Sequence, residues 1–145
     1  MYLLDTNVVS ELRKAKSAKA NANVVAWASS VSSASLFLSA ISILELEMGI
    51  LLLERRDAKQ GQTLRRWLET HVLPSFDGRI LAVDTAVARQ CAQLHVRDRC
   101  SERDALMAAT ALVHGLVMVT HNVKDFKATR VEIVDPWQHG DFNDK

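Results

Sequence analysis

The chain has 145 residues, of which 48% are hydrophobic and 24% charged, and its formal net charge is +1 at pH 7. These values are typical of one soluble globular domain. The balanced charge excludes an indiscriminate polycation, although local basic groups are still able to form a nucleic-acid site. An uncharged run from Ala20 to Leu44 is long enough to span a bilayer. It holds seven serines and two asparagines, which excludes a membrane span.

Short apolar runs alternate along the chain with segments of helical period. Strands are expected at residues 2–4, 36–39, 80–83, 116–119 and 131–134. Helices are expected at about 5–12, 23–31, 42–54, 60–73, 84–97 and 104–114. A charged turn at 55–58 separates the third and fourth helices, Pro74 ends the fourth, Asp84 caps the fifth and Gly115 ends the last.

This alternation predicts an α/β fold, a three-layer α/β/α sandwich with a central parallel sheet. The domain is expected to cover residues 1–137, followed by a polar C-terminal tail at 138–145. Cys91 and Cys100 match no zinc-ligand spacing and do not make a disulfide framework. We therefore expect two reduced thiols and a cytoplasmic protein.

Four acids from distant parts of the chain are predicted to meet at one edge of this sheet. Asp5 follows the first strand, and Glu45 lies one turn into the helix after the second strand. Asp104 opens the helix before the fourth strand, and Asp125 follows that strand. A helix that returns into a parallel sheet places its N-terminus at the edge where the strands end. Open α/β sheets carry their functional sites at that edge.

Three of these acids also have a purely structural interpretation. Asp5 is suited to be the N-cap of the first helix. Asp104 is the last residue of a capping-box spacing that begins at Ser101, and Asp125 is suited to a solvated turn. These interpretations and the functional one remain open together.

Glu45 has no comparable structural explanation. At 100° per residue, Ile41, Met48 and Leu52 lie within about 60° of it, so the helical period places it on an apolar stripe expected to face the core. Glu47 and Glu54 lie on the opposite side, which is expected to face solvent. A carboxylate on a core face is costly unless it is paired or binds a metal, and no basic residue lies beside it along the helix.

A cluster of carboxylates favours a divalent cation. Like charges raise one another's pKa, so the cluster is destabilising until a cation offsets the repulsion. Ligation by oxygen alone suits Mg²⁺ or Mn²⁺ rather than Zn²⁺. Such ions orient a phosphodiester, activate a water and stabilise the charge on the attacking and leaving oxygens. The five glycines are scattered and form no phosphate-binding loop.

Four segments carry a more specific signal, and they are LLDTN at 3–7, SAISILEL at 39–46, DALMAATA at 104–111 and VTHNVKDF at 119–126. In order and spacing they resemble the motifs of PIN-domain ribonucleases, most closely the VapC- and FitB-like toxins of bacterial toxin–antitoxin pairs. The resemblance runs from Tyr2 to Trp137 and includes the closing DPW at 135–137.

The resemblance implies a Mg²⁺- or Mn²⁺-dependent endoribonuclease that acts as a toxin. Its catalytic and metal-binding residues would be Asp5, Glu45, Asp104 and Asp125, with Thr6 and Asn122 as supporting polar residues. It also implies a homodimer that a small antitoxin inhibits by placing an arginine in the acid pocket. The antitoxin carries a DNA-binding domain, so operator DNA is reached only through it.

Two positions depart from the family pattern. Ser42 stands where threonine is usual, and His121 stands where arginine is usual before Asn122. The second change removes a fixed positive charge near the substrate path and bears on substrate preference more than on catalysis. Candidate RNA-facing basic residues, each equally explained as a solvated charge, are Arg55, Arg56, Arg65, Arg66, Arg97, Arg99, Arg103 and Lys124. Trp27 and Trp67 fit apolar helix faces and are expected to pack rather than to stack on bases.

Two other functions compete with this hypothesis. Asp5 at the end of a strand is also typical of phosphatases with an aspartyl nucleophile. Those enzymes commonly carry a second acid two residues later, where this chain has Asn7. The second alternative is a catalytically inactive PIN-like regulatory module whose acids bind a basic antitoxin segment.

Overall fold

A computed structural model describes residues 1–15, 17 and 19–140 of the chain. Lys16 in the basic connector, and residues 141–145 of the expected tail, lie outside the described residues. Five parallel strands form one sheet in the order β3-β2-β1-β4-β5. They are β1 (Tyr2–Leu4), β2 (Leu36–Ser39), β3 (Ile80–Leu81), β4 (Val117–Val119) and β5 (Ile133–Val134). The expected strands are all present, and the last three are shorter than predicted.

Helices connect the strands. They are α1 (Thr6–Leu12), α2 (Ala22–Ser30), α3 (Ala40–Arg56), α4 (Ala58–Trp67), α5 (Leu73–Ser75), α6 (Thr85–Arg97), α7 (Glu102–His114) and α8 (Val123–Phe126). Short 3₁₀ turns are η1 (Ser33–Ser35), η3 (Lys127–Thr129) and η4 (Pro136–Gln138), and η2 (Leu68–Val72) is a π-helical turn. None of the helices in the described part of the chain combines the length and the apolar character that a membrane crossing requires.

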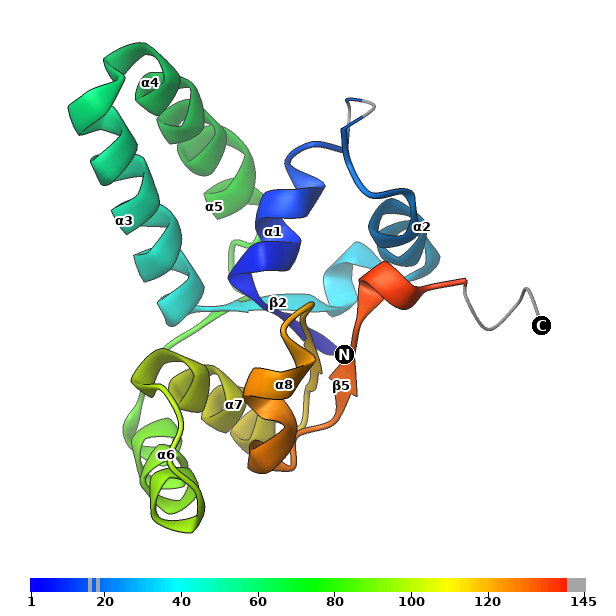
Figure 1. Ribbon diagram of the computed structural model, residues 1–145, viewed down its shortest axis with the longest axis vertical. Helices are drawn as coiled ribbons and strands as arrows, with labels where there is room; N and C mark the ends of the chain where they lie inside the picture. The colour runs from blue at the N-terminus through cyan, green and yellow to red at the C-terminus, as the bar shows by residue number, and fades with distance from the viewer. Residues whose placement is uncertain (16, 18, 141–145) are drawn as a thin grey trace.

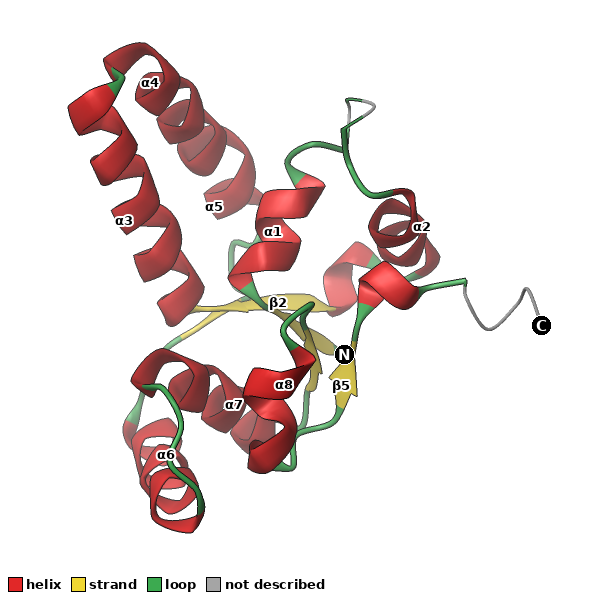
Figure 2. Cartoon of the chain, in the orientation of Figure 1, coloured by secondary structure: helices red, strands yellow, loops and turns green. Residues whose placement is uncertain are grey.

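The sheet separates two hydrophobic cores, as expected for side chains that alternate along a strand. Leu3 on β1 packs in one core with α6 and α7, whereas Leu4 packs in the other with α1, α2 and α3. Figure 1 shows α6 and α7 on one side of the sheet and the remaining long helices on the other. Figure 2 shows the same layers with the strands in yellow between red helices. The predicted three-layer α/β/α sandwich is confirmed.

The strand order places a topological switch at the middle of the sheet. The chain builds β1, β2 and β3 in one direction and then crosses to β4 and β5 on the other side of β1. The amide of Asp5 donates to the carbonyl oxygen of Val119 at 2.9 Å, so β1 and β4 end side by side. The carboxyl ends of strands at such a switch form a crevice in open α/β sheets.

Several helix boundaries differ from the prediction. Helix α3 already begins at Ala40, because the hydroxyl of Ser39 accepts the amide of Ile41, and it ends only at Arg56. The expected charged turn at 55–58 is reduced to Asp57, which caps α4. Helix α7 begins at Glu102, with Ser101 accepting a hydrogen bond from the amide of Asp104 at 3.2 Å.

Pro74 does not end the fourth helix, as the sequence had predicted. The helical path continues through η2 and α5 to Ser75. Proline has no amide hydrogen, and its ring clashes with the carbonyl four residues earlier in a regular α-helix. The wider π turn immediately before Pro74 is one of the ways in which a helix accommodates this interruption. Leu68 and Val72 within that turn are both buried in the core.

The helix caps predicted at Asp84 and Gly115 are confirmed. Asp84 accepts from the amide of Val87, and Gly115 adopts a left-handed conformation with φ of +66°. Trp27 is buried and meets Tyr2 edge to face, with ring centroids 5.3 Å apart. Trp67 packs against the core that contains Leu4, so both tryptophans are packing residues in this structure.

Candidate active site

Asp5 lies at the end of β1 and is both the N-cap of α1 and a member of the acid cluster. One carboxylate oxygen accepts the amide of Thr6 at 2.8 Å, and the other accepts the hydroxyl of Thr120 at 2.7 Å. Burial raises the pKa of Asp5, and the charges of Glu45 and Asp104 raise it further, against the lowering effect of the two hydrogen bonds. The structural and the functional interpretation of Asp5 are therefore compatible.

Thr120 is a site residue that the sequence reasoning missed. It is fully buried after β4, and its hydroxyl oxygen also accepts the amide of Asn122 at 2.9 Å. Thr120 directly follows β4, and Asp5 directly follows the neighbouring strand β1. Pairing of these two strands in the sequence-based prediction places the two side chains next to each other. The side chain links Asp5 to the segment that carries Asn122 and Asp125.

Glu45 lies at the same edge and is held by two side chains. Its Oε1 atom accepts the hydroxyl of Thr6 at 2.7 Å, and its Oε2 atom lies 3.3 Å from Nη1 of Arg103. Ser42, fully buried, lies with its hydroxyl 3.2 Å from that of Thr6. No basic residue lies beside Glu45 along α3, but Arg103 reaches it from α7.

The predicted environment of Glu45 is wrong in one respect. Ile41 is buried, but Met48 and Leu52 are 40% and 60% exposed, so their stripe does not face the core. The face that α3 buries contains Ser42, Leu46 and Ile50 and is rotated from Glu45 by roughly a quarter turn. Glu45 therefore lies at the border between the buried face and an exposed apolar stripe.

Glu47 and Glu54 do not simply face solvent, as had been predicted. Both carboxylates pair with the guanidinium of Arg65 on α4, at 3.0 Å in the case of Glu54. Helix α4 packs closely against this side of α3, since a Cβ atom on Gly61 would come 2.7 Å from the Cα atom of Glu54. Glu45 and Glu47 still lie on opposite faces of α3, as predicted: Glu45 contacts Thr6 and Arg103, and Glu47 contacts Arg65.

Asp104 and Asp125 complete the group at the edge. Burial raises the pKa of Asp104, and the charges of Asp125 and Glu45 raise it further. Asp125 is exposed in the first turn of α8, a short helix where the sequence predicted only a polar segment. The structure thus brings Asp5, Glu45 and Asp104 within electrostatic reach of one another, and Asp125 within reach of Asp104.

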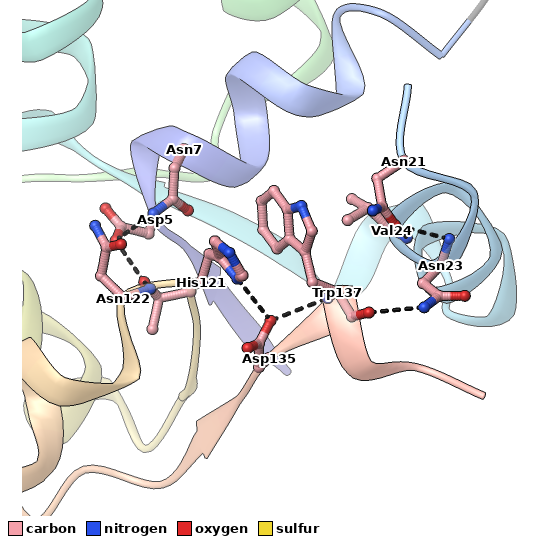
Figure 3. Close-up of polar contacts among 10 residues, drawn as sticks. Asp5, Asn7, Asn21, Asn23, Val24, His121, Asn122, Asp135 and Trp137 are labelled. Atoms are coloured by element: carbon pink, nitrogen blue, oxygen red, sulfur yellow. Dashed lines mark hydrogen bonds and ion pairs between the residues drawn. The ribbon is translucent and has the colours of Figure 1, made fainter. Parts of the chain in front are cut away.

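Asn122 lies beside Asp5, and His121 extends from the same segment toward Asp135 and Trp137, as Figure 3 shows. Asn122 is exposed and is connected to Asp5 through Thr120. His121 stacks on Trp137 with ring centroids 4.3 Å apart, and its Nδ1 atom lies 3.4 Å from Oδ1 of Asp135. The histidine that replaces the usual arginine is therefore held in place by the closing DPW segment.

The donor set fits a hard divalent cation. The side chains that converge here offer oxygen atoms, which are the ligands that Mg²⁺ and Mn²⁺ prefer. The Oδ1 atom of Asn7 is buried beside Asp5 and has no hydrogen-bond partner among the described residues. No three of the described acids bring oxygen atoms within 4.8 Å of one another, as expected for carboxylates that repel. A cation would offset the cost of burying these carboxylates and their mutual repulsion, which together raise the pKa values of Asp5 and Asp104.

The basic residues proposed for an RNA-facing surface fall into two groups. Arg65 is engaged with Glu47 and Glu54, and Arg103 with Glu45. The others are exposed, and they are Arg55, Arg56, Arg66, Arg97, Arg99 and Lys124. Arg65 is thus a link between α3 and α4 rather than a candidate for RNA contact.

Comparisons with known proteins cover almost the whole chain. The family model of the PIN domain matches residues 2–132. The chain is 35% identical over 143 residues to a VapC ribonuclease of Sinorhizobium fredii, covering 95% of this chain and 99% of the relative. It is 38% identical over 143 residues to toxin FitB of Neisseria gonorrhoeae, covering 94% and 99%. The solved structure of FitAB bound to a DNA fragment is similar with a TM-score of 0.85 at 35% identity, covering 94% of this chain and 96% of that chain.

Proposed function

This chain belongs to the PIN-domain family, and from that membership we propose that it is the toxin of a toxin–antitoxin pair. It cleaves RNA phosphodiester bonds as a Mg²⁺- or Mn²⁺-dependent endoribonuclease. The observation that supports this most directly is the position of Asp5, Glu45, Asp104 and Asp125. These acids come from separate segments, and their charges interact at one edge of the sheet.

The acids Asp5, Glu45, Asp104 and Asp125 would hold the metal. When bound there, Mg²⁺ or Mn²⁺ would supply the chemistry of orienting the phosphodiester, activating a water and stabilising the charge on the attacking and leaving oxygens. Thr120 fixes the carboxylate of Asp5 in its ionised form, because a hydrogen bond to the charged form favours that form. The hydroxyl of Thr6 donates to Oε1 of Glu45 and holds that carboxylate in position.

The side-chain amide of Asn122 is free to contact a substrate, because it is exposed and does not cap α8. His121 presents a half-exposed ring beside it, where the family usually has arginine. We propose that this ring contacts the substrate and bears on which RNA is cut.

A small antitoxin with a DNA-binding domain is the proposed partner, and operator DNA is reached only through it. A site rich in carboxylates is suited to an arginine, because guanidinium and carboxylate groups form paired hydrogen bonds. Arg103 already pairs with Glu45 at the rim of the cluster. An antitoxin arginine would pair with the other acids of the cluster.

A homodimer is also part of the proposal. Helix α3 carries an exposed apolar stripe of Leu44, Met48, Leu51 and Leu52, and Figure 1 shows this helix at the outside of the molecule. Contiguous exposed apolar surface of this kind marks an interaction site. We assign it to a second copy of the chain.

The proposed compartment is the cytoplasm, in agreement with free thiols at Cys91 and Cys100.

The proposed nuclease domain covers residues 1–137, and the tail at 138–145 lies outside it. The side-chain amide of Asn23 donates to the carbonyl oxygen of Trp137 at 2.7 Å, which fastens the closing segment to α2.

Glu45→Gln and Glu47→Gln form a matched pair that tests the function. The first keeps the shape of the side chain but removes a charge that would hold the ion, so RNA cleavage in Mn²⁺ is expected to fall by orders of magnitude. The second removes only the ion pair with Arg65, so activity is retained and the free energy of unfolding falls by about 1 kcal/mol or less. Cleavage is measured on cellular RNA with sequencing of the cut ends, beside an EDTA control.

Equal activity of the two variants contradicts the role of Glu45. A wild-type protein that cuts no RNA in Mg²⁺ or Mn²⁺, yet binds its antitoxin, contradicts the enzyme. That result favours the alternative of an inactive PIN-like module that binds a basic antitoxin segment.

A further inference from the structure

A second group of metal-ligating side chains lies where α6 meets α7. Cys91 and His95 are four residues apart on α6 and therefore on the same helix face, and Glu102 is the first residue of α7. One sulfur, one ring nitrogen and one carboxylate oxygen from these residues all lie within 4.8 Å of one another. The acid cluster described above contains no comparable mixture of sulfur, nitrogen and oxygen.

The imidazole of His95 is the most informative member of this group. Its Nε2 atom is buried and has no hydrogen-bond partner among the described residues. Oε2 of Glu102 lies 3.5 Å away, within ion-pair range, but forms no hydrogen bond with it. Buried polar atoms in folded proteins are normally hydrogen-bonded, so a ring nitrogen without a hydrogen bond, close to a thiol and a carboxylate, calls for a ligand.

Cys91 supplies the sulfur from within the core. Its side chain is buried and it forms no disulfide. A cation of sufficient affinity for sulfur removes the proton, since only the thiolate is a strong ligand. A buried thiol beside a histidine and a carboxylate therefore suits a metal that binds thiolate strongly.

We propose that Cys91, His95 and Glu102 bind a Zn²⁺ ion, with a water in the fourth position. Zinc takes four ligands in a tetrahedron and accepts thiolate, imidazole and carboxylate together. Mg²⁺ and Mn²⁺ prefer oxygen ligands, so the two clusters of this protein select different metals.

The site can close on an ion with small movements. In a tetrahedral zinc site with zinc–ligand distances of about 2.0–2.3 Å, neighbouring ligand atoms lie about 3.5 Å apart. The three ligand atoms here lie within 4.8 Å of one another, so each needs to move by roughly 1 Å at most. The side chain of Glu102 is 75% exposed and is free to supply that movement. His95 and Glu102 also line an open hollow of about 700 Å³ together with Cys100, which gives an ion access from solvent.

A bound ion would join the last turn of α6 to the first turn of α7. Asp104 of the acid cluster lies two residues after Glu102 in that same turn. Zinc is therefore expected to stabilise the segment that positions Asp104. The inference stands on the geometry of α6 and α7 and does not depend on nuclease activity.

Cobalt substitution tests the proposal on the full chain. Co²⁺ is added in the presence of excess Mg²⁺, which occupies oxygen-only sites, and absorption is recorded. We expect a thiolate-to-cobalt charge-transfer band in the near ultraviolet, intense visible bands of tetrahedral cobalt, and loss of both when Zn²⁺ is added. Zn²⁺ alone is expected to raise the melting temperature.

Variants identify the ligands. Cys91→Ser is expected to abolish the charge-transfer band, and His95→Gln or Glu102→Gln to weaken cobalt binding by roughly tenfold or more. Cys100→Ser and His114→Gln are the matched controls and leave the spectrum unchanged.

Three results would overturn the site. They are no charge-transfer band in the wild-type protein, a band that is lost in Cys100→Ser but kept in Cys91→Ser, or binding that His95→Gln and Glu102→Gln leave intact. If Cys91→Ser does not fold, cobalt binding by the His95→Gln and Glu102→Gln variants decides the outcome. His95 is partly exposed and Glu102 is exposed, so replacing them leaves the core unchanged.

Discussion

Replacement of Thr120 by valine removes one hydroxyl from the centre of the acid cluster and keeps the shape of the side chain. That hydroxyl donates to Asp5 at 2.7 Å and accepts the amide of Asn122 at 2.9 Å, and the residue is fully buried. Burial already raises the pKa of Asp5, and Thr120 is the largest of the influences that lower it. In the variant, the ionised form of Asp5 is therefore expected to cost the folded protein more free energy.

The expected loss at neutral pH is about 1.5–3 kcal/mol, the range for a hydrogen bond to a charged group. For a chain of this length that corresponds to a fall in melting temperature of about 3–12 °C. The folded-state pKa of Asp5 is raised in the wild-type protein and rises further in the variant. The penalty is therefore full above these pKa values and shrinks as the pH falls through them, because protonated Asp5 no longer needs the donor.

Thermal and urea unfolding of both proteins in EDTA, at several pH values, measure this effect. Thr110→Val is the matched control, because Thr110 is also fully buried but its hydroxyl donates only to the carbonyl oxygen of Leu106 within α7. Its smaller cost is expected to be independent of pH. A Thr120→Val penalty that is no larger than that of Thr110→Val, or that does not change with pH, would refute the account of Asp5.

Two further substitutions test the electrostatics and the packing. Asp104→Asn is expected to raise the free energy of unfolding of the metal-free protein at neutral pH, because burial and the charges of Asp125 and Glu45 raise the pKa of Asp104. This gain fades as the pH falls through that raised pKa, and a melting series in EDTA that shows no gain at neutral pH contradicts it. Gly61→Ala is expected to cost about 1–3 kcal/mol in urea unfolding, because the new Cβ atom would meet the backbone of Glu54 at 2.7 Å. The control Gly49→Ala meets nothing within 4 Å and is expected to stabilise the helix by about 0.5–1 kcal/mol, so equal effects of the two changes would contradict the close packing of α3 and α4.

The sequence predicts the sheet and the edge of the sheet where the acids gather because both follow from local patterns. Asp5 directly follows an apolar run, and Asp104 opens a helix of small and apolar residues. The direction of a parallel sheet then places both at one edge. Only short-range periodicity and the handedness of connections enter this reasoning.

Contacts between distant segments are not encoded in such patterns. The period of α3 assigns Glu45 to an apolar stripe, but it does not say which apolar stripe the sheet covers, and Met48 and Leu52 are exposed. Arg103 lies 58 positions from the Glu45 that it pairs with, and no spacing rule connects the two. Proline normally ends a helix, and the π turn that lets the helix continue past Pro74 leaves no recognisable pattern in the sequence.

The cluster at Cys91 was hidden for the same reason. The two cysteines have no zinc spacing, and the third ligand of the proposed site comes from the next helix. Only the packing of α6 against α7 brings Glu102 to the helix face that carries Cys91 and His95.

The hydrogen bond from the amide of Asp5 to Val119 gives the two halves of the acid cluster different mechanical character. Asp5 is anchored by backbone and side chain to the central strand pair, so moving its carboxylate breaks contacts of the sheet. Asp125 lies outside the sheet on the four-residue helix α8, where its neighbour Phe126 is fully buried but Asp125 itself is exposed. A partner or a substrate can therefore turn the side chain of Asp125 without moving the core, whereas the sheet fixes the position of Asp5.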